Sequence, residues 1–142
     1  MSSDNSIKTD KAPKPVGPYP HARRVGPFLF VSGMGPRQPG TDTIPGGPIR
    51  DASGPLDYDV AAQTHATLKN IEVVLEASGL TLRDVVDVQV FLVNMDRDFQ
   101  TFNGVYREYF TEDPPTRTTV EVGALPTPIA VELKVIAWVG PA

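Results

Sequence analysis

Residues 131–139 have the sequence VELKVIAWV, and the alternation within this stretch decides the predicted fold. Successive side chains of a β-strand point to opposite faces of its sheet, so this stretch has one apolar face and one mixed face. The apolar face consists of Val131, Leu133, Val135 and Ala137. The mixed face consists of Glu132, Lys134, Ile136 and Trp138. A strand of this kind belongs to a sheet whose apolar face is covered by another layer.

A helix with one apolar stripe is predicted to supply part of that layer. Its stripe recurs at helical spacing and consists of Val60, Thr64, Leu68, Ile71 and Leu75. Asp57 or Asp59 can cap its N-terminus, and Gly79 is suited to the position just beyond its C-terminus. Its polar residues are expected to face mainly solvent, and they are Gln63, His65, Lys69, Asn70 and Glu72.

A second helix is predicted after residues 85–93, whose sequence VVDVQVFLV is typical of a strand. We expect Asp98 to cap this helix and the pair Pro114–Pro115 to end it. One face of the helix is aromatic and is interpreted as core. It consists of Phe99, Phe102, Tyr106 and either Tyr109 or Phe110.

The remaining segments complete a single α+β domain over residues 13–142, preceded by a flexible lead-in at 1–12. Residues 28–32 and 117–122 are predicted strands, and the Gly- and Pro-rich residues 34–56 form a loop or a loose hairpin. The element order predicts a mixed sheet with two helices on one face. Because the sequence holds no third layer for the other face, we expect that face to be buried between the subunits of a homo-oligomer.

The composition narrows the classes of function. The 142 residues carry a net charge of −4 and no run of Lys and Arg, which disfavours a nucleic-acid partner. The chain has no cysteine, so disulfides, thiolate metal sites and a cysteine nucleophile are excluded. The N-terminal residues lack the apolar core of a secretory signal, and no apolar stretch is long enough to span a membrane. We therefore expect a soluble cytoplasmic protein.

Six motifs resemble, in the same order, those of the RidA/YjgF family: GPYPHA (17–22), FVSGMGP (30–36), EASGL (76–80), FNGVYREYF (102–110), PPTRTTVEVGALP (114–126) and VELKVIAWV (131–139). The resemblance covers nearly the whole chain from about Ala12 onward. It implies a chorismate-mutase-like α+β fold, assembled as a homotrimer with its sites in clefts between subunits. It also implies hydrolysis of 2-imino acids or their enamine tautomers to 2-keto acids and ammonia, with no metal or organic cofactor.

The resemblance assigns substrate-binding roles to five residues. Arg117 matches the arginine that binds the substrate carboxylate, and Tyr19 matches a tyrosine that lines the pocket. Ser32 and Gly33 match a Ser-Gly pair at the end of an early strand. Asn103 matches an asparagine of the second helix.

Three departures from the family pattern indicate a specialised branch. Lys134 stands where the last strand usually has a glutamate that positions water, and Glu132 lies two residues earlier. Thr119 replaces a frequent cysteine, and the loop at 37–56 is longer than in typical members. GPYPHARR, this loop and the stretch RTTVEVGALPTPIAVELKVIA are similar to those of 2-aminomuconate deaminases of aromatic catabolism.

The residue chemistry leaves alternatives open. A guanidinium at Arg117 can hold a carboxylate through two parallel hydrogen bonds, or it can form an ordinary salt bridge. His21 is a candidate for proton transfer because it lies two residues from Tyr19. Glu132 is a candidate for holding the attacking water, although Glu132 and Lys134 can also form a structural ion pair.

The substrate is also left open. A second carboxylate, which 2-aminomuconate would bring, has Lys134 as its first candidate partner, with weaker candidates in Arg23, Arg24 and Arg37. The alternatives to a 2-aminomuconate deaminase are a general deaminase of 2-iminopropionate and 2-iminobutyrate, and a non-catalytic trimer that binds a small carboxylate. A nuclease or translation-related role is disfavoured by the acidic composition.

Overall fold

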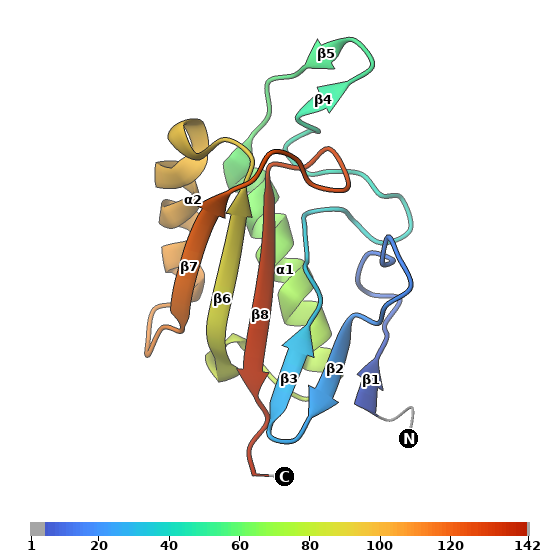
Figure 1. Cartoon of the computed structure of the whole chain (residues 1–142), viewed down its shortest axis with the longest axis vertical. Coiled ribbons are helices and arrows are strands. Elements are labelled where there is room, and N and C mark those ends of the chain that lie inside the picture. Colours follow the sequence, from blue (N-terminus) through green and yellow to red (C-terminus); the bar gives the residue numbers. More distant parts are fainter. Residues whose placement is uncertain (1–4, 142) are drawn as a thin grey trace.

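The computed structural model describes residues 5–141, and within that range the chain forms a six-stranded sheet with both helices on one side (Figure 1). The strands, in their order across the sheet, are β1 (Ser6–Ile7), β2 (Ala22–Val25), β3 (Phe28–Val31), β8 (Val131–Trp138), β6 (Val85–Leu92) and β7 (Thr116–Glu121). Neighbouring strands are antiparallel except for β6 and β7, which are parallel. The prediction of an α+β mixed sheet with two helices on one face is confirmed.

Strand β8 lies near the middle of the sheet and has the two faces that its sequence predicts. Val131, Leu133, Val135 and Ala137 are completely buried in the core. The alternate residues are half-buried or, at Trp138, exposed. The apolar face packs on helix α1 (Val60–Ala77), whereas neither helix covers the opposite face (Figure 1).

Helix α1 has the predicted ends and the predicted buried stripe. The side chain of Asp59 caps the helix by accepting a hydrogen bond from the Ala62 N–H at 3.1 Å. Gly79 follows the last turn with a φ of +77°, a left-handed conformation that glycine adopts without strain. Leu68 and Ile71 are fully buried against the sheet. These contacts fix the helix on the apolar face of β8.

Three polar residues of α1 were wrongly expected to face solvent. Gln63 and Asn70 are buried because their side chains hydrogen-bond to the backbone of neighbouring loops. His65 is half-buried, and its Nδ1 lies 2.7 Å from the Tyr109 hydroxyl on the second helix. Hydrophobic spacing alone does not reveal such partners, since they come from distant parts of the chain.

Helix α2 (Met95–Tyr109) begins one turn earlier than predicted. Its N-cap is Asn94, whose side chain accepts the Arg97 N–H at 3.1 Å. Asp98, the predicted cap, lies inside the first turn and is completely buried. Its carboxylate accepts hydrogen bonds from the Tyr58 hydroxyl at 2.6 Å and from Arg97 at 2.7 Å. The predicted aromatic core of the helix is confirmed at Phe102, Tyr106 and Phe110.

The segments before β2 and after β3 differ in part from the prediction. Ser6–Ile7 pairs with β2, and Ala12 is buried in the core, so the described part of the expected lead-in packs on the domain. Residues 1–4 lie outside the described residues. The Gly- and Pro-rich stretch contains a projecting hairpin of β4 (Arg50–Asp51) and β5 (Gly54–Pro55) (Figure 1). No helix within residues 5–141 has the length and apolar character that a membrane span requires.

Candidate active site

Two adjoining pockets lie where three distant segments of the chain meet. They share Tyr19, Gly33, Gly35 and Arg37. The first pocket is completed by Pro13, Pro15, His21, Ser32 and Met34, and the second by Val16, Pro126, Thr127, Ile129 and Glu132. The predicted residues Tyr19, His21, Ser32, Gly33 and Glu132 are therefore brought together by the fold.

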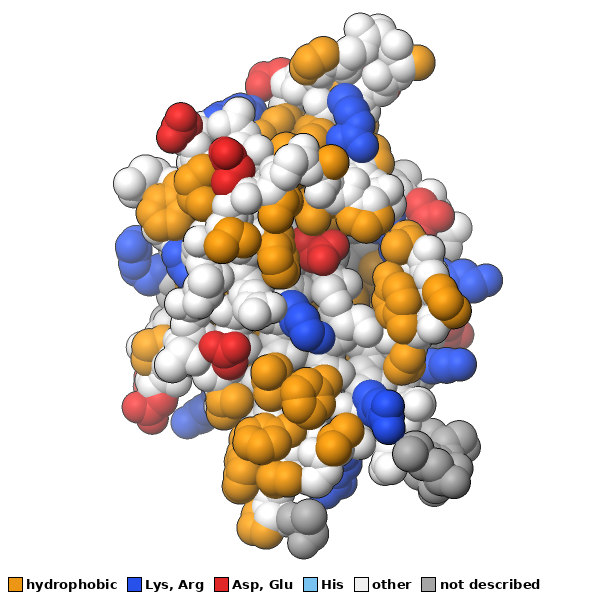
Figure 2. Space-filling view, viewed as in Figure 1, with side chains coloured by type: hydrophobic (Ala, Val, Ile, Leu, Met, Phe, Trp, Pro, Cys, Tyr) orange, Lys and Arg blue, Asp and Glu red, His pale blue; other side chains and the backbone are white. Residues whose placement is uncertain are grey.

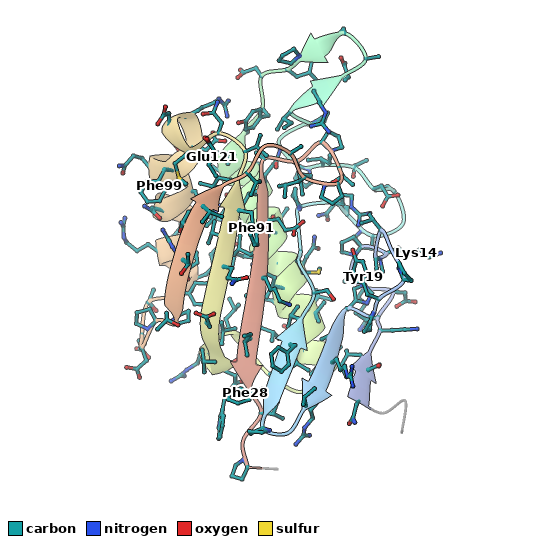
Figure 3. The ribbon with its side chains drawn as sticks, in the orientation of Figure 1. Lys14, Tyr19, Phe28, Phe91, Phe99 and Glu121 are labelled. Carbon is teal, nitrogen blue, oxygen red and sulfur yellow. The ribbon has the colours of Figure 1, made fainter. Side chains whose placement is uncertain are left out.

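Backbone and side-chain hydrogen bonds hold the Gly-Pro-Tyr segment against the end of β3. The Ser32 N–H donates to the His21 carbonyl at 2.9 Å, and the Ser32 hydroxyl donates to the Pro20 carbonyl at 2.7 Å. These bonds place Tyr19 at the wall of both pockets, with 41% of the residue exposed (Figure 3). Ser32 thus lines the first pocket and also holds the segment that carries Tyr19.

His21 has both ring nitrogens engaged with the backbone. A backbone N–H can only donate, so the Thr9 N–H, at 3.2 Å, fixes Nδ1 as an acceptor. The proton is then on Nε2, which donates to the Pro13 carbonyl at 2.8 Å. His21 is also only 5% exposed. Both ring nitrogens are therefore engaged by the segment before β2, and proton transfer by His21 stays a prediction.

The carboxylate of Glu132 lies directly against Gly33. A Cβ atom on Gly33 would be 3.0 Å from Glu132 Cδ and 3.4 Å from Cγ, so glycine leaves the room that this side chain occupies. Burial raises the pKa of Glu132 above its usual 4.5, and the positive charge of Lys134 partly opposes the rise. A desolvated carboxyl in a pocket is suited to accept and return a proton.

Lys134 lies on the same face of β8 but lines neither pocket. Its Nζ donates to the Val31 carbonyl at 3.0 Å. The substitution of lysine for the expected glutamate therefore does not deprive the pocket of a carboxylate, because Glu132 supplies one. Arg23 and Arg24 are exposed on β2 and also lie outside the two linings, whereas Arg37 lines both pockets.

The loop that carries Gly33, Gly35 and Arg37 is fixed by helix α1. The side-chain amide of Asn70 donates to the Gly35 and Arg37 carbonyls, each at 2.8 Å. Gln63 holds two further loops in the same way. Its side-chain amide donates to the Gly47 carbonyl and accepts a hydrogen bond from the Ala130 N–H. Both residues were predicted only to face solvent, and their positions beside the apolar stripe are the only sequence signal for this role.

Arg117 lies on the edge strand β7 and points toward the helices, since its register partner Val88 is completely buried. Its Nη2 donates to the Asn103 side-chain oxygen on α2 at 2.8 Å. The guanidinium carbon lies 4.7 Å from the centre of the Tyr106 ring, within cation–π range. Burial raises the pKa of Tyr106 to about 12, against the opposing charge of Arg117. The fold thus joins Arg117 and Asn103 into a second, separate cluster.

The two clusters do not meet within one chain. Strand β6 separates β7 from β8, which at ~4.8 Å per strand spacing puts the two strands roughly 10 Å apart. Arg117 faces the helices, whereas Glu132 faces the open side of the sheet. In Figure 3, Tyr19 of the pocket and Phe99, whose ring is 5.9 Å from the Arg117 guanidinium, lie at opposite sides of the molecule. The predicted site residues therefore form two separate clusters in one chain.

The sequence and fold match known proteins over almost their full length. The family model described as Endoribonuclease L-PSP matches residues 9–139. The chain belongs to the RidA/YjgF family. A RutC family protein of Pyrococcus horikoshii is 43% identical over 132 residues, which cover 93% of this chain and 95% of the relative.

Two further RidA-family members extend the comparison. The 2-iminobutanoate/2-iminopropanoate deaminase of Escherichia coli is 35% identical over 135 residues, covering 93% of this chain and 95% of that protein. The crystal structure of RidA from an Antarctic Psychrobacter species matches with a TM-score of 0.80 at 34% identity, covering 94% and 98% of the two chains. These matches confirm the family that the six motifs indicated.

Proposed function

We propose that this RidA-family protein is a hydrolytic deaminase of 2-imino acids that needs neither a metal nor an organic cofactor. The observation that carries the proposal is the half-buried carboxylate of Glu132, which lies directly against Gly33 in a pocket walled by Tyr19. A relative named for 2-iminobutanoate and 2-iminopropanoate deamination, at 35% identity, supports the same class of reaction.

The working site is proposed to form between subunits of a homotrimer. Arg117 and Asn103 lie at one edge of the sheet, and the Tyr19–Glu132 pocket lies toward the other, so a neighbouring copy can supply the missing half. The open face of the sheet supports this assembly. Phe30, Val120 and Trp138 are 38%, 41% and 43% exposed there. Figure 2 shows apolar side chains gathered at the lower end of this face.

In the proposed reaction, Arg117 of one subunit holds the C1 carboxylate through charge-assisted hydrogen bonds. Glu132 of the neighbouring subunit accepts a proton from water as the water oxygen bonds to C2 of the imine. The C=N π electrons move to nitrogen, and protonation there gives a tetrahedral carbinolamine. The hydroxyl proton then passes through Glu132 to the amino nitrogen as the C2–N bond breaks, so ammonia leaves and C2 becomes the carbonyl of the 2-keto acid. Orientation and proton transfer supply the acceleration.

The proposal is tested by following ammonia release from 2-iminobutanoate and 2-iminopropanoate. Arg117→Ala is expected to lower kcat/KM by about 10²-fold, because two charge-assisted hydrogen bonds to the carboxylate are lost. Arg24→Ala, which removes an exposed arginine outside the pockets, is the matched control. Normal turnover by Arg117→Ala would contradict the assigned role, and no turnover by the wild type would reject deamination of these acids.

A more specific candidate substrate is 2-aminomuconate. This candidate rests on the resemblance of the Arg117 strand and of the long loop to those of 2-aminomuconate deaminases. It is compared in the same assay after tautomerisation to its imine. Ligand-dependent thermal stabilisation without ammonia release would instead favour the trimer as a small-carboxylate-binding protein. Because the family model carries an endoribonuclease name, salt-dependent RNA binding is measured alongside, and we expect none from a chain of net charge −4.

A further inference from the structure

The pockets contain a cation for which the deamination chemistry has no use. Among the described residues that line them, Arg37 is the only one with a fixed positive charge, and it lines both. Only 16% of its side chain is exposed. The proposed reaction already uses Arg117 for the C1 carboxylate, so a second guanidinium beside Tyr19 and Glu132 calls for a separate explanation.

Arg37 is held in place from three directions. Its Nη1 donates to Asp42 at 2.8 Å, and its Nη2 donates to the Lys14 carbonyl at 2.8 Å. Its own carbonyl accepts a hydrogen bond from the buried Asn70 side chain. A short turn brings Asp42 back toward it, with Gln38 N–H bonded to the Thr43 carbonyl and Asp42 N–H to the Gln38 carbonyl. The guanidinium is therefore ordered before any ligand arrives, which lowers the entropic cost of binding.

The guanidinium keeps spare capacity to bind an anion. It has five N–H donors, and the contacts to Asp42 and Lys14 use one each. The side chain of Asp42 is 68% exposed, so solvent screens its attraction to Arg37. Asp42 therefore neutralises the positive charge of Arg37 in the pocket only in part. An arginine with free, fixed donors is suited to planar anions such as carboxylates.

We propose that Arg37 binds an anionic group at the far end of the substrate, so that the site prefers 2-imino acids with a second acidic group. The inference rests on the proposed function for the identity of the reacting end. In this arrangement Arg117 of the neighbouring subunit holds the C1 carboxylate, Glu132 acts at C2, and Arg37 receives the distal carboxylate. Arg37 is a specificity-determining residue and takes no part in the bond changes.

The test uses stable 2-keto acids, which are the products of the reaction, as matched pairs. 2-Oxoglutarate is compared with 2-oxopentanoate, and 2-oxoadipate with 2-oxohexanoate, by calorimetric titration of the assembled protein. Each pair has the same chain length and differs only in the distal carboxylate. We expect the diacid to bind about tenfold or more tightly in at least one pair, as for a hydrogen bond to a charged group.

Variants assign that preference to Arg37. Arg37→Gln is expected to bring the ratio of the two dissociation constants close to one, and Arg37→Lys to restore part of it. Arg24→Gln, an exposed arginine on β2, is expected to keep the wild-type ratio. Thermal unfolding of each variant checks that the fold is intact. The inference is overturned by equal binding of diacid and monoacid in both pairs, by a preference that survives Arg37→Gln, or by equal weakening of diacid and monoacid in that variant.

The same proteins separate this inference from the proposed function. Turnover of 2-iminobutanoate with no diacid preference would uphold deamination and reject the role of Arg37. An Arg37-dependent diacid preference with no ammonia release from any 2-imino acid would uphold the ligand class and reject deamination.

Discussion

Replacing Gly33 by alanine puts a methyl group where the Glu132 carboxylate now lies. The new Cβ would be 3.0 Å from Glu132 Cδ and 3.4 Å from Cγ, and it would overlap the carboxylate oxygen Oε2. Gly33 is not among the described glycines with positive φ, so alanine itself fits the backbone there. The atoms that the new methyl group would meet belong to the end of a flexible side chain. We therefore expect the Glu132 carboxylate to move while the fold stays unchanged.

The size of the effect follows from that displacement. Restoring ordinary contact distances moves the carboxylate by about 1 Å, and a misplacement of that size costs about 10²-fold in rate. The free energy of unfolding is expected to change by less than about 1 kcal/mol, because no core side chain is removed. The variant is therefore expected to lose activity while its stability stays nearly unchanged.

The assay is ammonia release from 2-iminobutanoate, with Gly123→Ala as the matched control. A Cβ on Gly123 would meet nothing within 4 Å, and Gly123 is also absent from the described positive-φ glycines. We expect the control to keep wild-type kcat/KM, while Gly33→Ala loses about two orders of magnitude. Wild-type kcat/KM in a folded Gly33→Ala protein would show that the position of Glu132 beside Gly33 is not the one that catalysis requires.

Four further outcomes follow from the contacts described above. The kcat/KM for 2-iminobutanoate is expected to rise with pH through the raised pKa of Glu132, and Glu132→Gln should abolish this limb of the profile. The same raised pKa means that the folded state binds the proton more tightly. The free energy of unfolding should then fall as pH rises from about 4.5 through the folded-state pKa, and in denaturant titrations Glu132→Gln should remove that fall. Asn103→Ala removes one hydrogen bond to Arg117 and should raise KM about fivefold in steady-state assays, with a smaller change in kcat. Asp98→Ala leaves the Tyr58 hydroxyl and Arg97 without their buried partner, and chemical denaturation should show a loss of about 2–3 kcal/mol.

The parts of the fold that the sequence predicts are those governed by local periodicity. The alternation in residues 131–138 determines both faces of β8, because each side chain must lie on one side or the other of the sheet. The start of α2 was misplaced because Asn94 and Asp98 are both acceptable caps. The choice between them depends on Tyr58, which lies 40 positions away from Asp98 and binds its carboxylate.

The sequence predicts individual site residues but not which of them lie together in the folded chain. Tyr19, Gly33 and Glu132 do share a pocket, because the Gly-Pro-Tyr segment, the end of β3 and β8 converge there. The sequence gives only weak support for Arg37 as a partner of a second carboxylate. Its position in the pocket depends on a loop that is held by the distant side chain of Asn70. His21 has the chemistry of a proton shuttle, but its ring accepts a hydrogen bond from the Thr9 N–H and donates one to the Pro13 carbonyl. Such long-range partners leave no periodic signal.

The most direct test is complementation between two impaired subunits. Arg117→Ala and Glu132→Gln chains are unfolded, mixed in equal amounts and refolded, and ammonia release from 2-iminobutanoate is measured. If each site takes Arg117 from one subunit and Glu132 from its neighbour, random assembly restores about one quarter of the wild-type sites. We predict that recovery, well above the residual activity of either variant alone. No recovery above the separate variants, in a mixture that has assembled, would contradict a shared site.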